Sequence, residues 1–368
     1  MTNASWESLS NQAVTVAGIV YFLALLAHSA QWAMLRRLPA DQTPEGDQTE
    51  VFGRFGLLLT AIAAVVHAVG LVGRGLAADP NRVPWGNMYE FTLSGTFVVT
   101  LGYLALHRRY RLAWMAPWVV GFVFVILMAA VIWLYEPVAP LTEALSSPWL
   151  VIHVVAAVIA TGIFSLAGLV SAVYLLKSRV LERQRRSTAV PVGAAAGGGS
   201  AVGASTAGGS GTRADAPATG MMARIPDLPA LDRLSYRLHA FAFPIWTFAV
   251  LISGPIWAHY AWSRYWGWDP KEVWAFITWV VYAAYLHARA TAGWKGRNAA
   301  IVALVGVATL WFNFIGINYF FGGSSQHSYA APAAVVERQE PPGPGGASGP
   351  VVTRGDLSVD LPEALSTG

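Results

Sequence analysis

The sequence predicts an all-α fold, a polytopic integral membrane helical bundle with about eight transmembrane helices. The first observation behind this prediction is composition, because 55% of the 368 residues are hydrophobic and only 12% are charged. A soluble domain carries about twice that charged fraction. The second observation is that apolar runs of about 20 residues, the length that crosses the hydrocarbon core of a bilayer, recur along the chain.

These apolar runs give the predicted membrane spans in chain order. Eight segments are long enough, at 14–35, 55–77, 88–107, 114–135, 148–176, 238–261, 274–291 and 299–321. The fifth follows Ser147-Pro148, a helix-capping residue and a proline suited to the first turn. Five spans therefore precede a long interruption of the pattern, and three follow it.

The spans and the segments between them divide the chain into four parts. Residues 1–176 hold the five N-terminal helices, and residues 238–329 hold three more with a tryptophan-rich external segment. The intervening 177–237 contains a run of Gly, Ala and Ser and is predicted to be a flexible cytoplasmic linker. Residues 330–368 include the run P-P-G-P-G-G and are predicted to be a disordered external tail. The first fourteen residues lack a basic segment, so we expect no cleaved signal peptide.

The distribution of Lys and Arg predicts the orientation in the membrane. Four segments share one side of the predicted topology, at 36–54, 108–113, 177–237 and 289–298, and they hold 18 of the 24 Lys and Arg residues. Without the long linker the two sides hold 9 and 6, which is a weaker excess in the same direction. Because positive charge accumulates on the cytoplasmic side, both termini are predicted to lie outside a bacterial cell membrane.

The charge pattern and the cysteine count also exclude some classes of function. The net charge of +4 is explained by topology and not by binding of nucleic acid. The chain has no cysteine, so it can form no disulfide framework, thiolate metal site or redox thiol of its own. Any thiol chemistry therefore belongs to a partner or a substrate.

Tryptophan is concentrated in one short external stretch of the chain. Residues 257–279 hold six of its sixteen tryptophans, at positions 257, 262, 266, 268, 274 and 279. One interpretation is an aromatic belt at the level of the lipid headgroups. The other is an aromatic platform for a large planar apolar ligand, favoured by W-G-W-D, where Gly267 would let a flat object approach the backbone. We favour the platform.

Polar residues next to this stretch have a structural and a functional interpretation. Asp269-Pro270-Lys271-Glu272 is a capping sequence, which is sufficient to explain Asp269 and Glu272. Arg264 and Lys271 could pair with the carboxylates of a ligand or with lipid headgroups. The earlier loop 83–91 could contribute Trp85, Asn87 and Glu90 to the rim of a site, or could simply be a capped helix start.

Three of the eight histidines are candidate ligands. His153 lies about 9 Å into the fifth span, and His327 follows the last span, so both are expected at the outer depth of the tryptophan stretch. Two imidazoles beside a dry aromatic surface suit the two axial positions of haem iron. Alternatively His153 is an interfacial residue bonded to a backbone carbonyl and His327 is solvated. His287 lies about 20 Å along its helix from Trp274, where it is either a functional intramembrane group or a side chain reaching the inner headgroups. For His67, within the second span, we favour a hydrogen-bonding or packing role.

The tryptophan stretch with its flanking histidines resembles a known family. The segment W-G-W-D-P-K-E-V-W-A-F (266–276), with His153 before it and H-S-Y (327–329) after it, is similar to the CcsA/ResC subunit of system II cytochrome c biogenesis, often labelled CcsB in actinobacteria. The resemblance also covers Pro84–Glu90 and His287, and so most of the chain. The linker and the proline-rich tail depart from the family pattern.

The resemblance implies which residues hold haem. His153 and His327 match the family's two external histidines, which ligate haem iron, and His287 matches its transmembrane histidine, a transient ligand of haem arriving from the inner side. The residues that match the WWD core, which cradles the porphyrin, are Trp262, Trp266, Trp268 and Asp269, and Trp274 in the same stretch is a further candidate for binding haem.

The resemblance also implies a function and partners. Together with a Ccs1/ResB-type membrane protein, the chain would present haem b externally and support its covalent attachment to the C-x-x-C-H motif of apocytochrome c, helped by a thiol-reducing pathway. It would then be a subunit of a cytochrome c synthase, although no residue is an obvious general base. The alternatives are a CcmC-like haem delivery protein without a synthase role and a structural subunit of a respiratory complex.

Overall fold

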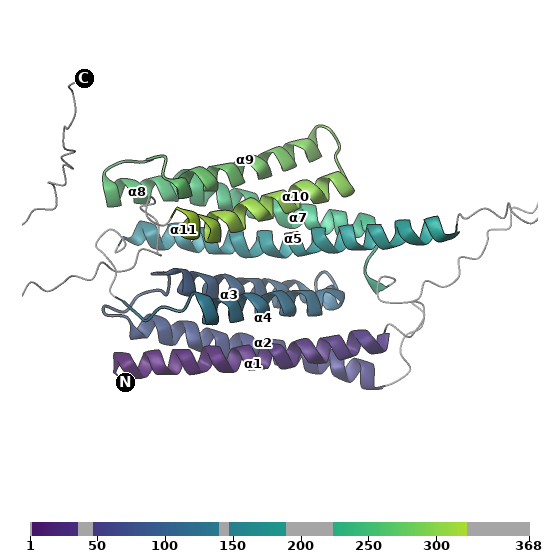
Figure 1. Cartoon of the computed structure of the whole chain (residues 1–368), viewed down its shortest axis with the longest axis horizontal. Coiled ribbons are helices and arrows are strands. Elements are labelled where there is room, and N and C mark those ends of the chain that lie inside the picture. Colours follow the sequence, from purple (N-terminus) through teal and green to yellow (C-terminus); the bar gives the residue numbers. More distant parts are fainter. Residues whose placement is uncertain (1, 36–46, 140–146, 189–223, 322–368) are drawn as a thin grey trace, which may run out of the picture. The chain divides into compact units, whose positions relative to one another are not determined.

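The computed structural model describes residues 2–35, 47–139, 147–188 and 224–321, which are helical with no strand among them. The helices run roughly alongside one another (Figure 1). In chain order they are α1 (Asn3–Leu35), α2 (Asp47–Ala77), α3 (Met88–His107), η1 (Leu112–Met115), α4 (Ala116–Trp133), α5 (Pro148–Thr188), α7 (Leu228–Thr247), η3 (Phe248–Ser253), α8 (Gly254–Trp262), α9 (Pro270–Ala290), α10 (Arg297–Trp311), η4 (Phe312–Gly316) and α11 (Ile317–Phe320).

Helices α1 to α4 form one group, in which α1 packs along α2 and against α4. The axes of α1 and α2 approach closely because small residues meet there. A Cβ atom on Gly70 of α2 would lie 2.8 Å from the side chain of Val14, and Ser10 Oγ donates a hydrogen bond to the Gly70 carbonyl at 2.7 Å. Close approach of small residues is the usual way in which helices associate where water supplies no hydrophobic driving force.

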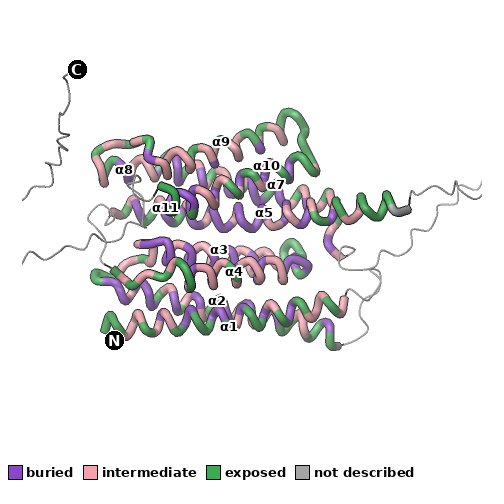
Figure 2. Tube along the Cα trace, viewed as in Figure 1, coloured by how far each residue is buried: buried purple, intermediate pink, exposed green. Residues whose placement is uncertain are grey.

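The second group is built around α5, which packs against α7 and α10 and also against α3 of the first group. Two rods of this group are each interrupted by a π-helical turn, η3 between α7 and α8 and η4 between α10 and α11. Stacked aromatic rings fill the centre of the group, with Phe164 and Tyr282 3.9 Å apart between centroids and nearly parallel. Buried residues lie between the helices (Figure 2).

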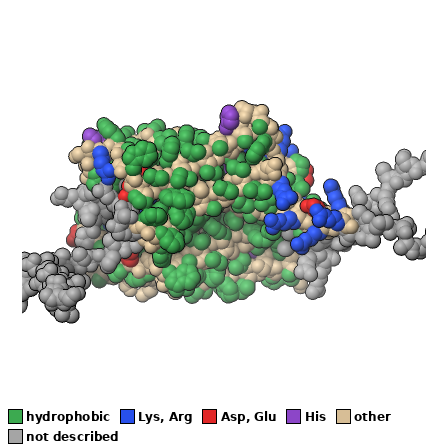
Figure 3. Space-filling view, turned by 45° about the horizontal axis from the view of Figure 1, so that its top comes forward, with side chains coloured by type: hydrophobic (Ala, Val, Ile, Leu, Met, Phe, Trp, Pro, Cys, Tyr) green, Lys and Arg blue, Asp and Glu red, His purple; other side chains and the backbone are tan. Residues whose placement is uncertain are grey.

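Six of the predicted spans are confirmed by helices long and apolar enough to cross a membrane, among the described residues. They are α1, α2, α4 with η1, α5, the rod α7–α8 and the rod α10–α11. The other two predicted spans correspond to α3 and α9, helices of 20 and 21 residues that are not among these six and pack against them. Hydrophobic side chains cover much of the face in Figure 3, while most of its Lys and Arg side chains gather at one end. This is the arrangement of a polytopic helical membrane protein.

The helices extend further into the predicted linker than the sequence indicated. Helix α5 continues to Thr188 and α7 already begins at Leu228, so the ends of 177–237 are helical and not flexible. The reason is that the basic extension of α5 is a helix exposed to solvent. Its residues up to Arg186 are largely exposed, and they include an ion pair between Arg186 and Glu182, one turn apart. Residues 189–223 and 330–368 lie outside the described residues, so a flexible linker and a disordered tail stay predictions.

A buried ionic cluster closes one end of the first helical group. Glu90 of α3 accepts a hydrogen bond from Arg74 Nε at 2.9 Å and another from Arg82 Nη1 at 2.6 Å. The side chains of Arg74 and Glu90 are completely buried, and the Arg74 guanidinium also lies over the Tyr89 ring. A buried charge is tolerated only when it is paired in this way. The cluster therefore fixes the loop that joins α2 to α3.

Candidate functional site

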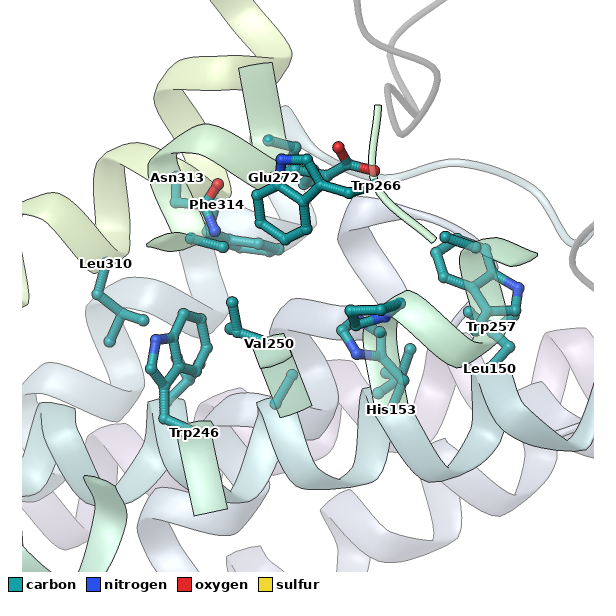
Figure 4. A pocket seen from close by; sticks show the side chains of 18 of the residues that line it. Leu150, His153, Trp246, Val250, Trp257, Trp266, Glu272, Leu310, Asn313 and Phe314 are labelled. Carbon is teal, nitrogen blue, oxygen red and sulfur yellow. The ribbon is translucent and has the colours of Figure 1, made fainter. Parts of the chain in front are cut away.

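A cavity lies at the end of the second helical group where α5 begins, between α5, η3, α8, the start of α9 and η4 (Figure 4). Its empty volume is about 990 Å³, part of which is open to solvent. Its wall is mainly aromatic and aliphatic, with rings from Phe91, Trp246, Trp257, Trp266 and Phe314.

His153 of α5 supplies the cavity with an oriented imidazole. Its Nδ1 lies 3.0 Å from the carbonyl oxygen of Ala249. A carbonyl can only accept, so Nδ1 carries the hydrogen and donates, and Nε2 carries the lone pair. The ring also stacks on Trp257, with centroids 5.8 Å apart and planes 17° apart. In metal-binding histidines, a hydrogen bond from the ring nitrogen that does not bind the metal fixes the tautomer and the ring orientation in the same way.

The π-helical turn η3 places the Ala249 carbonyl where His153 can reach it. Gly254 N–H donates to this carbonyl, five residues back, and Ser253 Oγ lies 3.3 Å from it. Pro255 follows and has no N–H to continue an ordinary helical ladder. Gly254 is required by packing, because a Cβ atom there would lie 2.9 Å from the Ala249 oxygen and 3.1 Å from His153 Cε1.

Two polar groups of the cavity wall have no hydrogen-bond partner within the described chain. They are the indole N–H of Trp266 and the side-chain oxygen of Asn313. Buried donors and acceptors are normally satisfied. An aromatic cavity with one oriented imidazole suits a planar, largely apolar ligand.

The predicted tryptophans divide into three positions around this cavity. Trp266 lines it, as does Trp257. Trp262 lies outside the cavity lining with its ring 4.9 Å from that of Trp257, and Trp274 packs on Phe312 at 4.2 Å. Trp268 is 74% exposed, with a left-handed φ of 57°. The stretch is therefore neither a uniform platform nor a uniform belt.

Asp269 and Glu272 have the capping roles that the sequence predicted. Asp269 is buried at the N-cap of α9 and accepts from the N–H of Lys271 at 2.9 Å. Glu272 accepts from the N–H groups of Gly267 and Asp269, at 2.8 and 3.2 Å. Glu272 also lines the cavity, whereas Asp269 does not. The capping box holds the chain from Gly267 to the helix start in one conformation.

The expected role of Gly267 is corrected by the structure. A Cβ atom at Gly267 would overlap the guanidinium of Arg264, so the open side of this glycine is filled by Arg264 and not by a ligand. The absence of a side chain serves close packing within the loop. Arg264 is not part of the cavity lining, which leaves Lys271 as the Lys or Arg among the lining residues that the structure describes.

Lys271 stands in the first turn of α9, ahead of the apolar stretch that begins at Trp274. Its Nζ lies 3.4 Å from the side-chain oxygen of Asn318. Burial lowers the pKa of Lys271 to about 8, while the nearby Asp269 carboxylate opposes the shift. The ammonium group is therefore poorly hydrated, and an anionic ligand group would stabilise it.

The early loop is a capped helix start and not a rim of the cavity. The Asn87 side chain accepts from the Glu90 N–H at 2.9 Å, and Glu90 belongs to the buried ionic cluster. The indole N–H of Trp85 donates to Ser94 Oγ at 3.2 Å, and its ring packs beside the hydrophobic cluster that contains Trp257. Only Phe91, one residue beyond this cap, reaches the cavity wall.

The remaining predicted ligands do not meet His153 within the described residues. His327 lies outside them. His287 is exposed on α9, well beyond the cavity, and is not part of its lining. His67 is completely buried in the first helical group, with its ring beside Tyr21 and Phe97, which agrees with the packing role preferred for it.

The part of the chain that forms the cavity matches a family model. Residues 85–323, about two thirds of the chain, match the model described as "Cytochrome C assembly protein". The chain belongs to this family. Its function accordingly lies in cytochrome c biogenesis, as the resemblance implied.

Curated relatives of this family member agree over most of its length. It is 32% identical over 339 residues to "Cytochrome c biogenesis protein CcsA" of Synechococcus sp. (strain JA-2-3B'a(2-13)), an alignment that covers 82% of this chain and 95% of that one. It is 30% identical over 282 residues to the protein of the same name from Porphyra purpurea, covering 75% and 87%.

Among solved structures, the fold is similar to that of "Cytochrome c Heme Lyase CcmF". The TM-score is 0.53 at 16% sequence identity. The match covers 86% of this chain but 49% of the other, so this family member spans about half of that protein. At this identity the similarity concerns the fold alone.

Several wall residues of the family member were not predicted from its sequence. Trp246 and Phe314 come from α7 and η4, far from the tryptophan stretch in the chain, and the Ala249 carbonyl is a backbone group. Two features of the sequence did indicate this part of the cavity wall. Pro255 interrupts a predicted span, and Asn313 is a polar residue in another apolar run. Both mark places where a membrane helix departs from regular geometry or faces a cavity.

Proposed function

We propose that the cavity receives haem b, as a substrate, and presents it for covalent attachment to apocytochrome c. In this proposal His153 Nε2 is one axial ligand of the iron, and His327 is the other. The observation that carries the proposal is the His153 hydrogen bond to Ala249, which leaves the lone-pair nitrogen as the ligand atom beside an aromatic wall. Helix α11, the last described helix before His327 in the sequence, lies at the same end of the helical group at which α5 begins (Figure 1).

The remaining parts of the substrate match groups of the cavity wall. The Trp257 and Trp266 rings would pack on the apolar porphyrin, and Lys271 would pair with a propionate. In the attachment itself, each cysteine S–H of the C-x-x-C-H motif adds across a vinyl group. The sulfur bonds to one vinyl carbon and the hydrogen to the other, so no oxidant is needed. The cavity contributes by holding haem in one orientation for these additions.

We further propose that the chain acts as a subunit of a cytochrome c synthase together with a Ccs1/ResB-type partner. The thiols of the apocytochrome must be reduced, which implies a thiol-reducing pathway. His287, exposed on α9 within a largely apolar helix, would take up haem from the inner side with a histidine of the partner. The positive-inside distribution of Lys and Arg supports a multi-pass protein of the bacterial cell membrane with both termini outside.

The proposal is tested by co-expressing the chain with a Ccs1/ResB-type partner and a reporter apocytochrome. Haem spectra of the purified complex and the yield of holocytochrome are compared for His153→Ala, His327→Ala and His287→Ala. We expect the two external variants to lose the low-spin spectrum of bis-histidine haem, and added imidazole to restore it partly in His153→Gly. His259→Ala is the matched control, because His259 is an exposed histidine of α8 outside the cavity lining.

The outcomes separate the proposal from its alternatives. Unchanged spectra and yield in both external variants would refute axial ligation by these histidines. Haem binding without any thioether product, even with the partner present, would instead indicate a delivery protein. A complex that never carries haem would indicate a structural subunit.

A further inference from the structure

A hydrogen-bonded ionic cluster joins three helices at the end of the second helical group opposite the cavity, where α9 turns into α10 (Figure 1). Asp232 of α7 accepts hydrogen bonds from Arg289 Nη1 at 2.6 Å and from Arg289 Nη2 at 3.0 Å. Its Oδ1 also accepts from the N–H of Gly296, the residue before α10, at 3.0 Å. We call these three residues the Asp232 cluster. One carboxylate therefore connects α7 with the last turn of α9 and with the start of α10.

The ion pair of this cluster is largely buried and its geometry is restrictive. The side chains of Arg289 and Asp232 are 8% and 13% exposed. The Arg289 guanidinium also lies over the Tyr236 ring, 4.7 Å from its centroid. A bidentate pair between arginine and a carboxylate fixes both the separation and the relative orientation of the two groups. The last turn of α9 is therefore held in one position against α7.

The turn between α9 and α10 is shaped to reach Asp232. Gly296 has φ 71° and ψ −134°, a conformation that residues with a side chain rarely adopt. A Cβ atom at Gly296 would also lie 2.8 Å from the hydroxyl oxygen of Tyr174. Both observations require glycine here, and this conformation directs the Gly296 N–H to the carboxylate.

The same turn of α9 carries His287. Its carbonyl accepts from the Thr291 N–H at 2.9 Å and from Thr291 Oγ1 at 2.8 Å, so the helix is still regular at this residue. Residues two apart on an α-helix point to nearly opposite sides, because each residue turns the helix by about 100°. Arg289 accordingly points to α7, while the His287 side chain is exposed. The cluster thus fixes the helix from the side that faces away from the imidazole.

We propose that Asp232 is a positioning residue for His287. By holding Arg289 and the turn at Gly296, it keeps the imidazole at the distance and angle needed for an axial bond to haem iron. Small displacements matter for such a bond, because a ligand must be held within about 0.5 Å of its productive position. The inference rests on the proposed function, in which His287 and a histidine of the partner take up haem. Asp232 itself would not touch the haem.

The test uses the full chain in complex with a Ccs1/ResB-type partner, in a His153→Ala/His327→Ala background. The low-spin haem that remains in this background is then the haem bound by His287. We expect Asp232→Asn to lower the low-spin fraction by about tenfold, the usual effect of losing hydrogen bonds to a charged group. Haem should stay bound in a high-spin form through the partner, and added imidazole should restore the low-spin spectrum. Glu182→Gln is the matched control, since it removes a carboxylate from the exposed pair with Arg186.

Gly296→Ala is a second variant, which disturbs the cluster from the turn and keeps both charges. We expect the same change of spin state, by about threefold or more. An unaltered low-spin spectrum in Asp232→Asn, or in Gly296→Ala if the first variant does not fold, would overturn the inference. Loss of haem without a high-spin form that imidazole restores would overturn it too, because that result indicates a purely structural role. An unaltered spectrum in His287→Ala would instead refute the inner haem site of the proposed function, and the inference with it.

Discussion

At the scale of single residues, the orientation of the His153 ring in the cavity depends on a few contacts. Its Nδ1 donates to the Ala249 carbonyl, one ring face stacks on Trp257, and the space beside Cε1 is left open by Gly254. No carboxylate is needed for this orientation. The tautomer is fixed by the backbone, so the ligand nitrogen would not change when an acidic side chain titrates.

Gly254→Ala tests this packing directly. We expect the added methyl group to push the His153 ring out of position, to lower haem occupancy several-fold and to destabilise the protein by about 1–3 kcal/mol, the usual effect of overpacking. Gly95→Ala is the control, because a Cβ atom there would meet nothing within 4 Å. Haem absorbance per protein and unfolding in detergent measure both effects. Equal occupancy in the two variants would contradict the packing argument.

The lowered pKa of Lys271 predicts a pH dependence for haem binding. Burial lowers that pKa to about 8, so in the protein without haem the ammonium group loses its proton as the pH rises through 8. A bound propionate stabilises the charged form, and affinity for haem should therefore fall above pH 8, by up to about tenfold per pH unit.

Two variants check the assignment of this pH dependence. Lys271→Met should bind haem more weakly and lose the decrease between pH 7 and 9. Arg264→Met should keep it, because a guanidinium stays charged in this range and Arg264 packs on Gly267 outside the cavity lining. Titration of each variant with haem at several pH values gives the slopes, and a slope retained in Lys271→Met would contradict the assignment.

Part of the residue-level site could be predicted from the sequence. Capping chemistry is local, so Asn87, Asp269 and Glu272 were recognisable as possible caps from their neighbours. His153 and Trp266 were predicted from an aromatic stretch and a histidine at the expected depth. The Ala249 carbonyl could not be predicted, because only the three-dimensional path of a π-helical turn brings it to His153.

At the scale of elements, the ionic cluster around Glu90 holds α3 and its preceding loop. Glu90 accepts hydrogen bonds from Arg74, Arg82 and the Gly86 N–H, and its side chain is completely buried. Phe91, the next residue, packs on Phe314 at 4.5 Å in the wall of the cavity that contains His153. The cluster thus positions one wall of the cavity from the first helical group.

Glu90→Gln should be strongly destabilising. It removes the carboxylate from two arginines, one with a fully buried side chain, and loss of one partner of a buried ion pair costs about 3–5 kcal/mol. Glu50→Gln makes the same change in the exposed pair with Arg54 and should change the free energy of unfolding by at most about 0.5 kcal/mol. Denaturant unfolding in mixed micelles measures both, and similar values for the two variants would contradict the burial argument.

The elements themselves were largely predictable, because a membrane imposes length and apolarity on every span. What could not be predicted was where helices continue into water. The exposed end of α5 carries Arg183, Arg185 and Arg186, so no apolar pattern marks it, and helical hydrogen bonds extend it together with the Arg186–Glu182 pair. The π-helical turns were likewise not predicted, since Pro255 indicates an interruption without giving its geometry.

At the scale of the whole molecule, the cavity that contains His153 and the Asp232 cluster lie at opposite ends of the helices. The cavity that contains His153 is built on α5 and later elements, with Phe91 added from α3. The Asp232 cluster is built on α7, the last turn of α9 and the start of α10. Substitutions in one should therefore leave the binding properties of the other unchanged.

The absence of cysteine makes the proposed orientation simple to test. Ser263→Cys and Ala292→Cys each introduce a single thiol at an exposed position, after α8 and after α9 respectively. In intact cells we expect a membrane-impermeant maleimide to label the first variant and to label the second only after permeabilisation. The wild-type chain provides the blank, and the reverse pattern would invert the topology.

The unbroken length of α5 has a mechanical consequence. Its 41 residues extend about 60 Å, twice the thickness of the hydrocarbon core, without an interior proline. His153 stands near one tip of this rod, while Lys177, closer to the other, is tethered to the Ile225 and Pro226 carbonyls. Such a rod behaves as a lever, so a force on the end near Lys177 would tilt the helix at the imidazole.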